Sequence, residues 1–111
     1  MADEEKKEDV KVNGAEWPKK LTLRKPVQGG DGHEVSELTF REPTVDDIHR
    51  CGDPCRVDFF DGNPKIVYND VAVSAMMSLL AAVPPSTIKS MNLKDWKNGR
   101  LLLTIPFLED L

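Results

Sequence analysis

The fold is decided by residues 21–41, which read LTLRKPVQGGDGHEVSELTFR. Apolar and polar residues alternate at both ends of this stretch, a pattern that is typical of half-buried strands. The middle part, residues 26–33, is rich in glycine, which permits the backbone angles of a turn. The stretch therefore predicts a β-hairpin with a long loop. Val35 has the opposite parity to Leu38 and Phe40, which indicates that it lies at a bulge or outside the regular pairing.

A short helix is predicted after the hairpin. Pro43 has no amide hydrogen to donate, so the second strand should end before it. Thr44 is a good N-cap, and Asp47 falls in the first turn, where the helix dipole favours an acid. The helix should end near Arg50, because Gly and Pro follow it closely. The next segment, residues 55–65, fits either a loop packed by its aromatic residues or a short extra strand.

The second half of the chain is predicted to begin with a long helix. This helix runs from Val71 to about Ala82, and Asn69 or Asp70 can cap it. Its residues are apolar nearly all round, as expected of a helix that is contacted on more than one side. The prolines that follow it should end it.

Two further helices are predicted before the end of the chain. Ser86 should cap a short one, and Asn92 should cap a last one that begins at Leu93. Gly99 and Pro106 lie within the last helix and predict a kink or an early end. One stripe of this helix holds, near helical spacing, Leu93, Trp96, Leu103 and Phe107.

These elements together predict an α+β fold, with an N-terminal β-hairpin followed by a small bundle of about three helices. The chain has 111 residues, enough for one modest domain and too few for two. Residues 1–15 are mostly charged or small, so we expect a disordered, solubilising tail. Residues 16–111 are expected to form a single domain.

Charge and hydropathy argue against nucleic acids and membranes as partners. The formal net charge is -4, which would be repelled by phosphate backbones. The only local basic cluster would be split between two faces of a strand; it comprises Lys19, Lys20, Arg24 and Lys25. No run of about 18 apolar residues could span a bilayer. Because the chain starts with polar, acidic residues and no secretory signal, we expect it in the cytoplasm.

The richest local cluster of reactive side chains is HRCGDPC, residues 49–55. His49, Cys51 and Cys55 could start a metal site, but a structural zinc site needs a second pair of ligands, and His33 is the only other histidine. The spacing of the cysteines also differs from the redox motif Cys-x-x-Cys. We therefore favour a polar turn with two free thiols over a metal or catalytic site. Since the motifs of common catalytic sites are also missing, the sequence predicts neither an enzyme nor a cofactor.

The segment LLLTIPFL, residues 101–108, is more apolar than a small domain with one hairpin should be able to cover. Surplus apolar surface usually marks a protein–protein contact. The alternative is burial in the core, which is favoured for Leu103 and Phe107. For Met76 and its neighbour Met77, a core position is weighed against an adaptable partner surface. The residues predicted to bind a partner are Met76, Leu80, Leu101, Leu102, Ile105 and Leu108.

The motifs resemble those of the small tail assembly chaperones of Mu-like and P2-like phages. Residues 21–47 contain LTLRKP, a Gly-rich turn and VSELTFREPTVDD, which is similar to the family pattern LxxP…G…ITELTLREPTAxDL. Residues 75–96 are similar to the helix, double-proline turn, short helix and LxxxDaxxL ending of the family. Residues 51–68 match no part of that pattern, and Pro106 disturbs what is usually a plain terminal helix.

The resemblance implies a chaperone that coats the long, apolar, helical tape-measure protein in the cytoplasm of the bacterial host. The tail tube protein would displace it when the tube polymerises, so it would be absent from the finished virion. The last helix could also join copies of the chain into a homo-oligomer. The alternative function is that of a structural minor tail or neck protein, which would remain in the virion.

Overall fold

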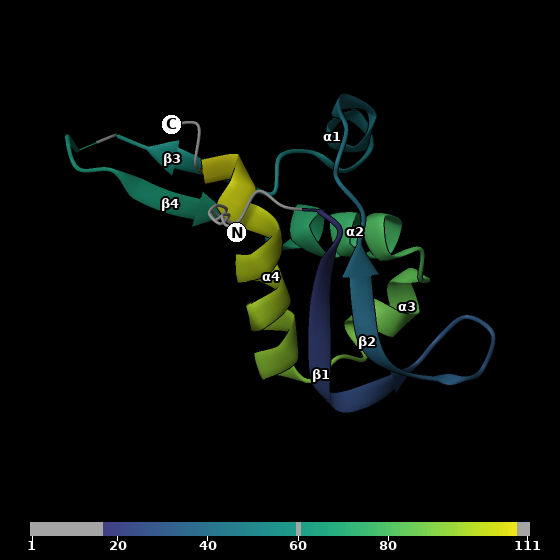
Figure 1. Ribbon diagram of the computed structural model, residues 1–111. Helices are drawn as coiled ribbons and strands as arrows, with labels where there is room; N and C mark the ends of the chain where they lie inside the picture. The colour runs from purple at the N-terminus through teal and green to yellow at the C-terminus, as the bar shows by residue number, and fades with distance from the viewer. Residues whose placement is uncertain (1–16, 60, 109–111) are drawn as a thin grey trace, which may run out of the picture.

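A computed structural model describes residues 17–59 and 61–108 (Figure 1). The predicted tail of residues 1–15 lies outside the described residues. An N-terminal hairpin is followed by helices, which confirms the predicted α+β fold. In chain order, the elements are β1 (Lys19–Gln28), β2 (Glu34–Phe40), α1 (Val45–Cys51), β3 (Cys55–Asp58), β4 (Lys65–Tyr68), α2 (Asp70–Ala81), α3 (Pro85–Lys89) and α4 (Leu93–Leu108).

Strands β1 and β2 pair in antiparallel fashion, as predicted. Leu21 lies opposite Leu38, and the register shifts between Thr22 and Val27. Beyond the shift Val27 lies opposite Val35, which confirms the expectation that Val35 belongs to an irregular part of the ladder. Leu21, Leu23 and Val27 are buried, whereas Lys25, which has the same parity and lies within the shift, is exposed.

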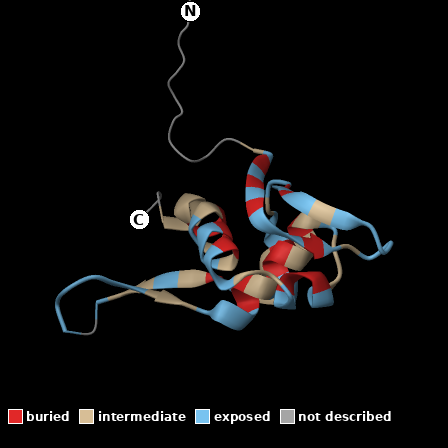
Figure 2. Cartoon of the chain, turned by 90° about the horizontal axis from the view of Figure 1, so that it is seen from below, coloured by how far each residue is buried: buried red, intermediate tan, exposed pale blue. Residues whose placement is uncertain are grey.

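The core lies between this face of the hairpin and α2, with α4 packed against β1 (Figure 1). Figure 2 shows buried positions in the hairpin, in α2 and on the inner side of α4. Helix α2 contacts α1, α3, α4 and β2, which explains why it is apolar nearly all round. The most deeply buried large side chains are those of Phe40, Leu38, Met76, Met77, Leu103 and Val73.

Helix α4 runs without a break from Leu93 to Leu108, so the predicted early end is wrong. Gly99 is buried where the helix meets its neighbours. A Cβ atom there would lie 3.0 Å from both Leu21 Cδ2 and Met77 Cε. Glycine therefore allows close packing of α4 here instead of ending the helix. Leu93, the first residue of the helix, is 65% exposed, so the apolar stripe is not buried at that end.

The helix caps follow the predictions with one exception. The side chain of Asn69 accepts a hydrogen bond from Ala72 N, and that of Asn92 accepts from Lys94 N and Asp95 N. The exception is α3, which has Pro84 as its N-cap and no side-chain cap, so the prediction of Ser86 is wrong. The first helical residue is itself a proline, which lacks an amide hydrogen that would need a cap.

The segment that the sequence left open forms a second antiparallel hairpin, β3–β4. It projects from the body of the molecule, and we call it the arm, residues 55–68 (Figure 1). Asn69 N donates a hydrogen bond to Pro54 O at 2.9 Å, so the two ends of the arm meet at its root. No helix among the described residues is long and apolar enough to cross a membrane.

Candidate partner-binding groove

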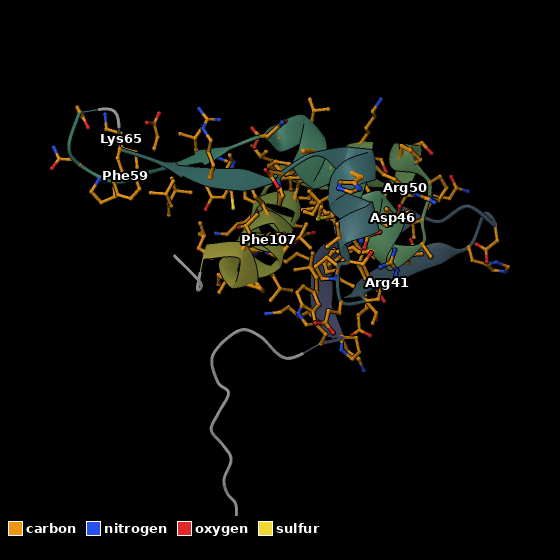
Figure 3. The ribbon with its side chains drawn as sticks, turned by 90° about the horizontal axis from the view of Figure 1, so that it is seen from above. Arg41, Asp46, Arg50, Phe59, Lys65 and Phe107 are labelled. Carbon is orange, nitrogen blue, oxygen red and sulfur yellow. The ribbon has the colours of Figure 1, made fainter. Side chains whose placement is uncertain are left out.

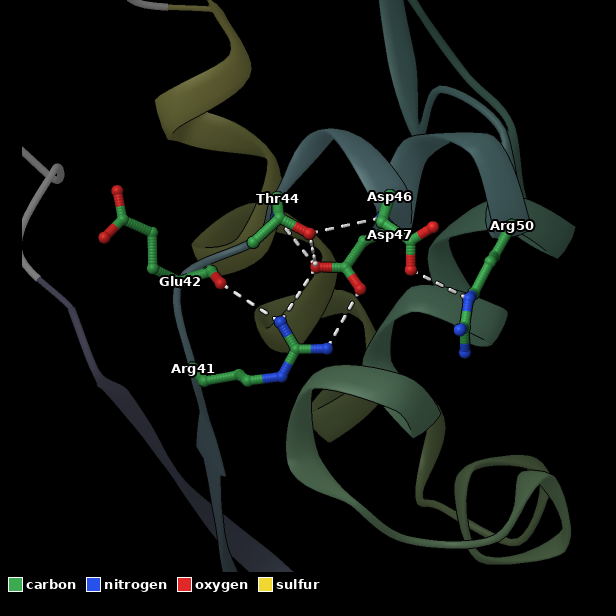
Figure 4. A network of polar contacts seen from close by, with 6 residues as sticks. All are labelled: Arg41, Glu42, Thr44, Asp46, Asp47 and Arg50. Atoms are coloured by element: carbon green, nitrogen blue, oxygen red, sulfur yellow. Dashed lines mark hydrogen bonds and ion pairs between the residues drawn. The ribbon is translucent and has the colours of Figure 1, made fainter.

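The Arg-Glu-Pro-Thr element and the aspartate after it form a structural network between β2 and α1 (Figure 4). Arg41 Nη1 and Nη2 donate to the two carboxylate oxygens of Asp47 at 2.8 and 2.9 Å. Thr44 N also donates to Asp47 Oδ2, and Asp47 N donates to Thr44 Oγ1, which completes a capping box. The Arg41 guanidinium holds the pKa of Asp47 well below its usual value. This element fixes the position of α1 relative to β2.

A groove of about 320 Å³ lies between β1 and α4. Its lining residues on β1 are Lys20, Leu21 and Thr22, and those on α4 are Asn98, Leu101, Leu102 and Ile105. Three of the α4 residues were predicted to bind a partner, and the structure brings them together. The residues of the β1 wall were not predicted, because neither hydropathy nor spacing indicates which helix packs beside a strand.

Helical geometry explains why α4 is apolar on its outer side as well. Leu103 has no exposed surface and faces the core. Leu101, Ile105 and Leu108 follow one another at spacings of four and three residues, so they share the face turned away from Leu103. Leu101 is 53% exposed, and Leu102, Ile105 and Leu108 are partly exposed. The helix is therefore buried on one side and apolar at the surface on the other.

Met76 and Leu80 do not belong to this surface. Met76 has no exposed surface and Leu80 is 3% exposed, because α2 is covered by its neighbours. Neither side chain can contact a partner in this conformation, so their predicted role is corrected to that of core residues. Of the two positions considered for Met76, the core and a partner surface, the structure shows the core.

Apolar residues are also exposed away from the groove. A second groove of about 470 Å³ is lined by Asp70, Val71, Ser74, Ala75, Pro85 and Lys89 of α2 and α3. Val71 is 82% exposed there. On the arm, Phe59 is 64% and Ile66 51% exposed. Figure 3 shows Phe59 on the projecting arm, separate from Phe107 on α4. The sequence did not predict that Val71 is exposed. A helix that is apolar on every side exposes apolar residues near its ends if the neighbouring elements do not extend far enough to cover them.

The cysteine segment forms no metal site in the part of the chain that the structure describes. Cys51 and Cys55 are free thiols and partly buried, and burial raises the pKa of each. His33 lies elsewhere, in the β1–β2 loop, where its Nδ1 is 3.2 Å from Asp31 Oδ2. No group of three or more His, Cys, Asp or Glu among the described residues could hold a metal ion.

Comparison with known families identifies the chain. Residues 20–99 match the model of the family described as phage tail assembly chaperone proteins, E, or 41 or 14. No curated protein and no solved structure matches the chain. The match covers most of the sequence and includes the hairpin, the Arg-Glu-Pro-Thr element, α2, α3 and the first half of α4. The chain therefore belongs to the family of phage tail assembly chaperones.

Proposed function

We propose that this chaperone binds apolar helical segments of the tape-measure protein during tail assembly, and that the groove between β1 and α4 holds them. The observation that carries the proposal is the outer face of α4, where apolar residues open into a groove that a second helix could fill. Family membership supports a role in tail assembly with protein partners. The action is non-enzymatic: residues 16–111 work as one domain that shields the client in the host cytoplasm.

The energetics favour a reversible complex. Complete burial of a leucine or isoleucine side chain contributes about 1.5 to 3 kcal/mol. Leu101 and Ile105 are only partly buried in the free chain, so burying the rest of each side chain against a partner would release part of this free energy on binding. Part of that gain is lost to the ordering of the client. The tail tube protein could then displace the chaperone, and the same apolar face could join copies of the chain when no client is present.

The test is co-purification of the tape-measure protein with variants of the tagged full-length chain. Leu101→Glu and Ile105→Glu place a charge in the groove and should abolish co-purification. Val71→Glu is the matched control, because Val71 is more exposed than either and lies in the other groove. Circular dichroism and thermal unfolding show whether each variant is folded.

The results of these experiments decide which groove binds the client and whether the protein is a chaperone or a structural component of the virion. Retained co-purification in both folded groove variants would overturn the groove as the client site. Loss in Val71→Glu alone would move the site to the groove between α2 and α3. Mass spectrometry of purified virions tests the role itself: a chaperone should be absent, whereas a stoichiometric amount would show a structural tail or neck protein.

A further inference from the structure

The charges around the β1–α4 groove are opposite in sign to the net charge of the chain. The formal net charge is -4, yet the charged residue that lines the groove is Lys20. Lys94 and Lys97 are exposed on the same face of α4, because they precede Asn98 and Leu101 by one helical turn. None of these three lysines forms an ion pair with another described residue.

Two acids lie near this surface, and they differ in burial. Asp95, the acid in α4, is 1% exposed. Its Oδ2 accepts hydrogen bonds from Arg24 N and Lys25 N at 3.0 and 3.1 Å, so it is used inside the fold. Glu37 of β2 lies directly opposite Thr22, so it is exposed on the same face of the hairpin as Lys20 and Thr22 and stands beside the groove, although it does not line it. The described groove therefore has an apolar floor, and beside it three exposed lysines outnumber the exposed Glu37.

From this charge complementarity we infer that the groove selects amphipathic client helices whose apolar stripe is flanked by Asp and Glu. The inference rests on the proposed function and names the chemistry of the bound segment. Leucine or isoleucine side chains of the client fill the space over Leu101 and Ile105, and its acids approach Lys20 and Lys97. Because exposed ion pairs are individually weak, the charges choose among apolar helices and add little to the total affinity.

Three synthetic helical peptides of equal length test this selectivity. They share one leucine stripe and differ only at the positions beside it, which are all Glu, all Gln or all Lys. Fluorescence anisotropy with the full-length chain at low ionic strength should show the Glu peptide binding about tenfold more tightly than the Gln peptide, and the Lys peptide most weakly. The preference should vanish near 1 M salt, where the Debye length is about 3 Å.

A charge reversal in the protein gives the sharper comparison. The double variant Lys20→Glu/Lys97→Glu should prefer the Lys peptide, since the net charge beside the groove has changed sign. Lys89→Glu is the matched control: this lysine is exposed and lines the groove between α2 and α3, so its reversal should leave the order of the peptides unchanged.

The outcomes distinguish this inference from the proposed function. Equal affinity for the three peptides, lost in Leu101→Glu, would overturn the charge selectivity and leave the groove as the client site. Binding that Leu101→Glu does not change would overturn both. Failure of all three peptides to bind overturns the inference, and co-purification of the tape-measure protein then decides separately whether the proposed function stands.

Discussion

The Asp47 carboxylate determines how the chain passes from β2 into α1. It accepts hydrogen bonds from Arg41, from Thr44 N and from Thr44 Oγ1, and its side chain is 3% exposed. Sequence rules place an acid in a first helical turn for its favourable interaction with the dipole. Here the acid also binds Arg41, the residue that directly follows β2, so one side chain fixes the connection between the two elements.

Replacing this carboxylate should be costly. In Asp47→Asn the amide cannot accept every bond that the carboxylate accepts, and Arg41 loses its ion pair. We expect the free energy of unfolding at pH 7 to fall by about 2 kcal/mol, measured by urea denaturation. Asp46→Asn is the control, because the Asp46–Arg50 pair is exposed and should contribute less than about 0.5 kcal/mol. Similar losses in the two variants would contradict this assignment.

The same residue predicts a pH dependence. The pKa of Asp47 is lower in the folded chain, chiefly because of its hydrogen bonds to Arg41, than the value of about 3.9 for an unfolded aspartate. Its contribution is therefore complete above the unfolded pKa and is lost as the pH falls through the folded pKa. The difference in stability between the wild type and Asp47→Asn should be constant from about pH 5 to 7 and shrink below about pH 4. Urea denaturation across this range measures it, and a difference that grows in acid would refute the sign.

At the scale of elements, the irregular part of β1 depends on one residue of α4. The register shift leaves the amide hydrogens of Arg24 and Lys25 without partners in the ladder, and Asp95 Oδ2 accepts both. Asp95 Oδ1 is buried and has no hydrogen-bond partner among the described residues. The carboxylate therefore stabilises the docking of α4 on the hairpin through one oxygen only.

Two substitutions separate the roles of these oxygens. Asp95→Ala removes the acceptor and leaves the part-buried amides of Arg24 and Lys25 without it, so the free energy of unfolding should fall by about 2 kcal/mol. Asp95→Asn keeps one oxygen as acceptor and puts an amide group in place of the unpaired one, so the loss should be about 1 kcal/mol. Urea denaturation compares them, and equal losses would show that the negative charge matters more than the acceptor.

Arg100 contributes to the attachment of the arm to the body, beside the packing of β3 on α4. Its guanidinium lies 4.3 Å from the centroid of the Tyr68 ring and 5.3 Å from that of Trp96, and its Nη1 is 3.1 Å from Asp70 Oδ1. These contacts join β4, α2 and α4. A hairpin of two short strands has little stability of its own, so the arm needs this attachment.

Removal of the guanidinium should therefore loosen the arm selectively. In Arg100→Ala we expect amide hydrogen exchange in β3 and β4 to accelerate about tenfold, which corresponds to about 1.4 kcal/mol of local stability. Exchange in β1 and β2 should not change. Arg100→Lys keeps the charge but loses the planar stacking group, so an intermediate rate is expected. Uniform acceleration throughout the chain would indicate a global effect instead.

The elements that sequence predicted are those governed by local rules. The alternation of apolar and polar residues predicted the first hairpin. The hydrogen-bonding capacity of short polar side chains predicted the caps at Thr44, Asn69 and Asn92. The arm could not be predicted with certainty, because its strands, CRVD and KIVY, are too short to show an alternation of apolar and polar residues. The continuity of α4 through Gly99 was not predicted for a different reason. The glycine is required by a close contact with Met77, and this contact forms only when the helices pack in the folded chain.

At the scale of the whole molecule, apolar surplus located the helix of the candidate site but not its surroundings. The apolar α4 residues of the groove follow from the composition of residues 101–108, whereas Asn98, the β1 wall and the lysines beside it depend on packing. Met76 and Leu80 were assigned to a surface because the number of neighbours around α2 cannot be counted in a sequence. Four elements enclose that helix in the structure.

The whole molecule should tolerate loss of the arm. The hydrophobic core includes no residue of β3 or β4, and the root is closed by the bond from Asn69 N to Pro54 O. Replacing residues 55–68 by a short Gly-Ser turn should leave the rest folded and lower the free energy of unfolding by less than about 2 kcal/mol, mostly through the lost contacts of Tyr68 with Arg100. Heteronuclear NMR spectra and urea denaturation test this, and collapse of the hairpin signals would show that the arm supports the core.

The closed root of the arm also has a genetic consequence. Since the chain leaves and re-enters the body at neighbouring points, codons between Pro54 and Asn69 can be gained, lost or exchanged by recombination without displacing a single core position on either side. Among descendants of one ancestral gene, differences in length should accumulate here first.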